Sequence, residues 1–332
     1  MLLQNAFLGS LVADAVSMPV HWYYDVKALD ADYDDIADYR APHNPHPDSI
    51  LWRSSYEPIN PRADILHGQQ KYWGKRGIHY HQNLKAGDNT LNLQLAAELY
   101  LHILREGDFR AENWLKRYVE VMLTPEWHDD TYAEEYHRAF FSNYASGIKL
   151  LSCGVPDYHI GSLSLVPALL AGLEAIGRTD QAEMLEDVCS LVRSTHNHPY
   201  SLSAGQDLAR TLLHLKKGHE IRESLTNLSL NGISVRQLQK FEAMEDRVVV
   251  GEKLSTACYL PESLLASCHF AWKYHDDFSK AVFSNALVGG DNCHRGVVVG
   301  AIVASQVGIP NVLLEELRVL KKLSSVIDFS VP

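Results

Sequence analysis

The stretch that most constrains this chain of 332 residues is 288–305, where two glycines lead into an apolar segment. The glycines permit a tight turn because they lack a Cβ atom, and Asp291 or Asn292 then stands where a helix N-cap is expected. Small residues recur every fourth position in the segment that follows, at Gly296, Gly300 and Ala304. Because such positions share one face of a helix, the pattern predicts a buried helix that a neighbouring helix can approach closely.

A second stretch, residues 86–104, repeats this order of glycine, aspartate, asparagine and helix. Asp88, Asn89 and Thr90 precede an amphipathic helix predicted at 91–104. A helix N-terminus offers free amide donors and the positive end of a dipole. Two such ends predict a composite site in which Asp88 and Asp291 bind a hard cation. The alternative, that each aspartate is only an N-cap, remains open.

Helical spacing dominates the rest of the chain, and strand-like alternation is limited to short pieces such as 247–251. Helices are predicted at 3–16, 64–73, 111–123, 133–151, 162–176, 180–193, 201–216, 234–241, 261–274, 277–287 and 312–323. Residues 30–61 are rich in Asp and Pro, with five prolines between 42 and 61, and are predicted to form a long loop. The pattern predicts one all-α domain spanning 1–332.

The charge balance excludes some partners. The net charge is −11, and Lys and Arg form no cluster beyond short pairs, which argues against a nucleic-acid backbone or an anionic membrane as partner. Five cysteines without paired spacing favour a reducing, cytoplasmic location. No apolar run is long enough to span a membrane. The oligomeric state cannot be predicted from these features.

Additional polar residues surround the two aspartates. Asn89, Thr90 and Asn292 can supply neutral oxygens to a cation, and His294 an imidazole. The segment His21-Trp22-Tyr23, just after the first helix, is either a hydrophobic plug with polar tips or a stacking surface for a planar ring. Arg295 either pairs with a ligand phosphate or neutralises a surplus carboxylate.

Five blocks in the right order resemble the ADP-ribosylglycohydrolase superfamily, in the branch that includes the jellyfish J-type lens crystallins. The blocks are AFLGSLVADAVSMPVHW (6–22), AGDNTLNLQLAAELYLHIL (86–104), GSLSLVPALLAGL (161–173), SLVRSTHNHP (190–199) and AVFSNALVGGDNCHRGVVVGAIVAS (281–305). The resemblance implies a single orthogonal multi-helix bundle. It also implies a magnesium-dependent hydrolase that cleaves the N- or O-glycosidic bond of an ADP-ribosylated or other small-molecule substrate.

The sequence departs from the family pattern at carboxylates that would hold the metal. Asn89 and Cys293 each replace an aspartate, His294 replaces a threonine, and His21 replaces an acidic residue. With fewer carboxylates, one Mg²⁺ ion is expected rather than two, or none. Nearby imidazoles favour zinc or another transition metal as the alternative; they belong to His21, His79, His81 and His294.

Two hypotheses follow. In the first, the chain is a metal-assisted hydrolase in which Asp88 or Asp291 binds the metal and orients water. His21, or one of the pair His79 and His81, acts as acid or base, and Trp22 or Tyr23 stacks on the base of the substrate. In the second, the chain is an inactive ligand-binding or structural relative, as the lost carboxylates favour.

Overall fold

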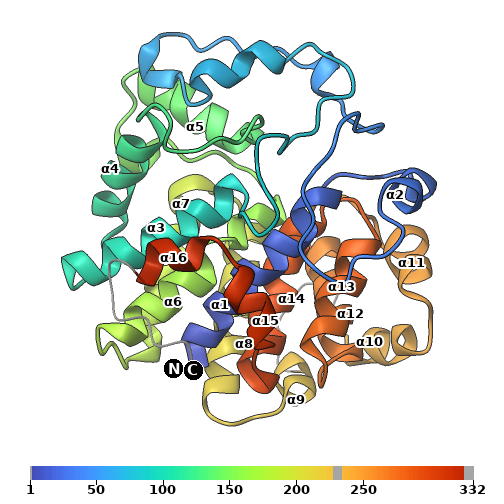
Figure 1. Ribbon diagram of the computed structural model, residues 1–332. Helices are drawn as coiled ribbons and strands as arrows, with labels where there is room; N and C mark the ends of the chain where they lie inside the picture. Colours follow the sequence, from blue (N-terminus) through green and yellow to red (C-terminus); the bar gives the residue numbers. More distant parts are fainter. Residues whose placement is uncertain (1, 227–233, 325–332) are drawn as a thin grey trace.

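The structure, a computed structural model, describes residues 2–226 and 234–324 (Figure 1). In this part of the chain helices account for the regular structure, and only isolated β-bridges are present, so the predicted all-α class is confirmed. The α-helices are α1 (Leu2–Ser17), α2 (Val26–Asp32), α3 (Leu91–Glu106), α4 (Ala111–Met122), α5 (Glu135–Ala145), α6 (Val166–Ala175), α7 (Gln181–Thr195), α8 (Pro199–Lys216), α9 (Ile221–Thr226), α10 (Val235–Glu242), α11 (Asp246–Val248), α12 (Glu262–Lys273), α13 (Phe278–Leu287), α14 (Asn292–Val307), α15 (Asn311–Glu316) and α16 (Val319–Ser324).

Helices α1 and α14 lie at the centre of the bundle and pack closely against each other (Figure 1). A Cβ atom added to Gly300 would lie 2.2 Å from the carbonyl oxygen of Gly9, and one added to Gly9 would meet Ala304 at 2.4 Å. Glycine is therefore required on both helices where they cross. The predicted close approach along the small-residue face of 288–305 is confirmed, and it places the polar first turn of α14 inside the protein.

Several predicted helix boundaries are wrong. Residues 64–73 contain a 3-10 helix (His67–Tyr72) rather than an α-helix, and the helix predicted at 133–151 ends at Ala145. The segment 312–323 forms two short helices, α15 and α16, because Leu317 between them has an extended backbone conformation. The strand-like piece 247–251 forms no strand: its first two residues end α11, and Val250 and Gly251 lie in a kink with non-helical backbone angles. Within the described ranges, no helix combines the length and apolar character needed to cross a bilayer.

The Asp- and Pro-rich loop lies against the bundle instead of extending from it. Helix α2 occupies its start, and a 3-10 helix (Leu51–Arg53) is the next helical element. Asn44 accepts a hydrogen bond from the backbone of His79, and the imidazole of His46 contacts the backbone oxygen of His21. The loop is thereby held beside the segment that follows α1.

Candidate functional site

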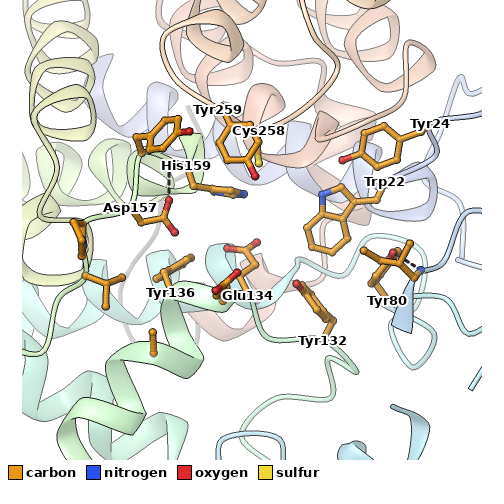
Figure 2. Close-up of a pocket in the computed structure, with 16 residues that line it drawn as sticks. Trp22, Tyr24, Tyr80, Tyr132, Glu134, Tyr136, Asp157, His159, Cys258 and Tyr259 are labelled. Carbon is orange, nitrogen blue, oxygen red and sulfur yellow. Dashed lines mark hydrogen bonds between the residues drawn. The ribbon is translucent and has the colours of Figure 1, made fainter. Parts of the chain in front are cut away.

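The candidate site is a cavity of about 500 Å³ that opens between the segment after α1, the start of α5 and two loops (Figure 2). Its volume is within the range typical of small-molecule sites. The residues that line it are Trp22, Tyr24, Ile50, Tyr80, Tyr132, Glu134, Glu135, Tyr136, Ala139, Val155, Pro156, Asp157, Tyr158, His159, Cys258 and Tyr259.

Trp22 enters this cavity from an unusual backbone conformation. Its φ is 62°, in the left-handed region that bulky residues rarely adopt. Two backbone hydrogen bonds hold it there: Trp22 N–H donates to Gly290 O at 2.8 Å, and Gly290 N–H donates to Tyr23 O at 2.6 Å. The indole then stacks on the His21 imidazole, with ring centroids 3.8 Å apart. The glycine turn before α14 therefore orients an aromatic wall of the cavity.

Asp291 lies beneath the cavity and is completely buried. Its Oδ1 atom is 2.9 Å from His21 Nε2 and 2.6 Å from His294 Nδ1. Its Oδ2 atom has no hydrogen-bond partner among the described residues, and His159 Nε2 lies 3.8 Å away. Burial alone would raise the pKa of the Asp291 carboxyl, but the charge of His294 and the hydrogen bond from His21 hold it well below its usual value.

His294 joins Asp291 to a second carboxylate. Its Nε2 atom is 2.8 Å from Glu134 Oε1, and Glu134 also accepts from the Asn92 amide at 3.1 and 3.2 Å. Burial opposes the charged form of His294, but the two carboxylates outweigh it and raise its pKa well above the usual value. Burial likewise opposes the charge of Glu134, whose pKa is nevertheless lowered by His294. Without a metal, this arrangement is an imidazolium between two carboxylates.

His21 is joined on its other side to a third carboxylate. His21 Nδ1 lies 2.7 Å from His81 Nε2, and His81 Nδ1 lies 2.5 Å from Asp130 Oδ1. The other oxygen of Asp130 accepts from the backbone of Leu91 at the start of α3. Burial lowers the pKa of His21 to about 3, so the ring is neutral near pH 7. The result is a buried hydrogen-bonded series in the order Glu134, His294, Asp291, His21, His81 and Asp130.

Asp88 is not part of this hydrogen-bonded series, and its predicted pairing with Asp291 is wrong. Its carboxylate accepts from Lys85 N–H at 2.8 Å and pairs with Arg318 at 2.8 Å, in a separate surface cavity. The reason is that Asp14, from α1, occupies the start of α3 instead. Its two oxygens accept from the backbone and hydroxyl of Thr90 and from the amide of Asn89. Asn89 and Thr90, predicted metal ligands, are therefore bound to Asp14.

The remaining predicted site residues make contacts within the scaffold and do not line the cavity. Tyr23 is buried with its hydroxyl on Asp32, away from the cavity, so it does not stack on a ligand there. His79 accepts from the backbone of His81, and its other nitrogen contacts a backbone oxygen. Asn292 donates to two backbone carbonyls, as does Arg295. The Arg295 guanidinium is fully buried and does not line the cavity, so a ligand phosphate cannot reach it in this conformation.

Sequence reasoning missed several residues of the site. They are Asn92, Asp130, Glu134, Asp157, His159 and Cys258. One signal was present: the segment 128–137 places two adjacent acidic pairs and two histidines immediately before and within a helix. By itself this pattern does not indicate a site, because Glu134 and Glu135 also match an ordinary acidic first turn of a helix. The segment containing Asp157 and His159 carries no comparable pattern.

The donors around Asp291 fit magnesium poorly. Mg²⁺ prefers an octahedron of oxygens, whereas the Asp291 Oδ1 atom is flanked by imidazole nitrogens. His21, Asp291 and His294 do form a group whose ligand atoms lie within 4.8 Å of one another. The second ring nitrogen of each histidine has a partner, His81 or Glu134, in the manner of metal-ligating histidines. Two imidazoles and a carboxylate suit zinc or another transition metal.

Comparisons with known proteins agree with the resemblance in the sequence. The family model described as ADP-ribosylglycohydrolase matches residues 3–329. Crystallin J1A of Tripedalia cystophora is 25% identical over 316 residues, which cover 91% of this chain and 87% of that protein. A solved structure described as an ADP-ribosylglycohydrolase-related protein complex has a TM-score of 0.60 at 19% identity, covering 98% of this chain and 95% of the other, and so shares its fold. This chain therefore belongs to the ADP-ribosylglycohydrolase family.

Proposed function

We propose that the chain is a hydrolase of an N- or O-glycosidic bond, of the ADP-ribose type or a related one, acting in the cavity beside Trp22. Membership of the family supports a glycohydrolase-like function. The observation that carries the proposal is the position of Glu134, which lines the open cavity and also contacts the buried His294. A charged carboxylate held at a cavity wall suits the stabilisation of an oxocarbenium-like transition state.

His159 is the proposed hydrogen-bond donor to the leaving group. Its Nδ1 atom accepts from the backbone N–H of Gly161 at 2.8 Å, so the neutral ring carries its proton on Nε2. That nitrogen is directed toward the cavity, opposite Trp22 and close to Glu134 (Figure 2). Glu134 would then stabilise positive charge on the sugar, or orient the attacking water. The Nε2–H of His159 would donate a hydrogen bond to the departing atom, which takes its proton from water.

The family is typically metal-dependent, and this chain has candidate ligand clusters. We propose that one ion is bound, and that it is zinc or a similar transition metal in preference to magnesium. His21 Nε2, His294 Nδ1 and Asp291 Oδ1 are the ligands in this proposal. An ion there would act as a Lewis acid toward water or a sugar hydroxyl. The ion and the proton on His294 Nδ1 compete for the same position, so only one of them is present at a time.

Glu134→Gln tests the proposed role of the carboxylate. It keeps the shape of the side chain and removes the charge, and a loss of kcat of about 100-fold or more is expected. Glu112→Gln, an exposed position on α4, is the matched control. Substrates should include ADP-ribosylated peptides and simple nucleosides, each with zinc, with magnesium and with a chelator. Equal turnover in the parent and in Glu134→Gln would refute the proposal.

A second candidate function is that of an inactive structural or ligand-binding relative. The specific observation in its favour is that His294 already pairs with one oxygen of Asp291 and one of Glu134 without an ion. The similarity to a protein named as a crystallin fits this alternative. It predicts an unchanged Tm in chelator and in zinc, together with no turnover. A rise in Tm of several degrees with one bound zinc ion per chain would contradict it.

A further inference from the structure

We propose that the cavity takes a positively charged ligand with a planar ring and no phosphate group, such as a cationic N-glycoside. This inference deepens the proposed function, and it rests on that function only in treating the cavity as the ligand site. It departs from the ADP-ribose-type substrate that the family suggests. Three features of the cavity support the inference. Its wall is acidic, the nearest cationic side chains are paired elsewhere, and aromatic rings line it.

The wall of the cavity is acidic. Glu134, Glu135 and Asp157 line it, and the described lining residues include no Lys or Arg. A phosphate placed here would be close to several carboxylates at a site partly shielded from water, where like charges repel more strongly than in bulk solvent.

The cations near the cavity are engaged elsewhere. The guanidinium of Arg295 is buried and donates to the backbone carbonyls of Thr256 and Gly289. Arg138 does not line the cavity; its guanidinium lies 5.8 Å from the ring centroid of Tyr132 and donates to the carbonyl of Ala133. His294 has both ring nitrogens directed at carboxylates. None of these groups is placed to hold a diphosphate in the cavity.

The start of α5 also opposes anion binding. A helix N-terminus ordinarily attracts a phosphate through its free N–H groups and dipole. Here Glu134 is the N-cap residue and Glu135 is in the first turn, so the protein's own carboxylates occupy this end. The same carboxylates face the cavity, where they favour a cation.

Aromatic rings provide the remaining recognition. Trp22, Tyr80 and Tyr132 meet edge to face, with centroid distances of 4.6 Å, 5.1 Å and 5.4 Å among the three. Tyr158 and Tyr259 also line the cavity, and their ring centroids are 5.2 Å apart. Figure 2 shows Glu134 and His159 across the cavity from Trp22, with Asp157 beside His159. Ring faces attract organic cations, and most strongly where the cation is desolvated.

Calorimetric titration of the full chain tests the inference without requiring turnover. The probes are nicotinamide riboside, which is a cationic N-riboside, its uncharged reduced form, and ADP-ribose. We expect nicotinamide riboside to bind at least tenfold more tightly than the reduced form, and ADP-ribose to show no saturation at millimolar concentration. Tighter binding of ADP-ribose, equal binding of the two ribosides, or no binding of any probe would overturn the inference.

Two variants assign the effect to the acidic wall. Asp157→Asn retains the oxygen that accepts from His159 N–H, and Glu135→Gln changes an exposed side chain at the rim. Each should reduce the preference for the cationic riboside at least threefold, whereas Glu112→Gln should not change it. Binding of the cation without hydrolysis would refute the proposed function and leave this inference standing. Hydrolysis of ADP-ribosylated substrates without a preference for cations would do the reverse.

Discussion

Acid sensitivity is a direct consequence of the buried histidines of this chain. Burial is the largest cause that lowers the pKa of each of five nearly inaccessible rings. They are His21 (about 3), His46 (about 4), His137 (about 3), His79 and His196. Because their pKa values in the folded protein lie below the ordinary 6.5, the unfolded chain binds more protons as the pH falls below about 6.5. Stability is therefore lost from about pH 6.5 downward, toward the folded pKa values.

The expected loss of stability is large because the contributions of the five buried histidines add. At pH 5 each of these rings is protonated in the unfolded chain and neutral in the folded protein. This difference lowers the free energy of unfolding by about 2 kcal/mol for each ring. Five rings cost about 10 kcal/mol, which is comparable with the whole stability of an ordinary protein. Asp291 and Glu134 have lowered pKa values, so their contribution disappears only below the ordinary carboxyl range. His294 has a raised pKa and contributes fully below about 6.5. Neither effect offsets the loss near pH 5.

Urea unfolding followed by circular dichroism at several pH values between about 7.5 and 5 measures this loss. Near pH 5 the free energy of unfolding should fall by about 7 kcal/mol per pH unit, which corresponds to the uptake of about five protons. His46→Gln should reduce this slope by about one proton, and His43→Gln is the control for removing an exposed imidazole. A change of less than about 2 kcal/mol between pH 7.5 and 5 would refute the reasoning.

Three further predictions concern the scaffold. Gly300→Ala should destabilise the protein by about 3 kcal/mol, because the added Cβ would lie 2.2 Å from the carbonyl of Gly9; an unchanged Tm would contradict this. Asp88→Ala should cost less than about 1 kcal/mol, since its pair with Arg318 is partly exposed, and calorimetry should show unchanged zinc and ligand binding. Asp14→Ala should cost about 3 kcal/mol or more in chemical denaturation, because three donors at the start of α3 lose their acceptor.

Local patterns in the sequence predicted the helical class and the buried start of α14, but not all helix boundaries. Periodicity predicted the all-α class, and the small residues of 288–305 predicted the close contact that buries the start of α14. The five sequence blocks predicted the family. Trp22, which the sequence offered as a stacking surface, lines the cavity, and its binding of a ligand stays a prediction. These features depend on neighbours within a few residues, which the sequence displays directly.

The tertiary structure decided which distant carboxylates meet the two helix ends. Asp88 and Asp14 can each satisfy the free N–H groups at the start of α3, and nothing in the local spacing distinguishes them. The packing of α1 beside α3 selects Asp14, and Asp88 is then left to pair with Arg318 at the surface. In the same way, only the folded chain brings Glu134 to His294, across 160 residues of sequence. A side chain's partners across the core depend on how helices pack, and packing is a property of the whole chain.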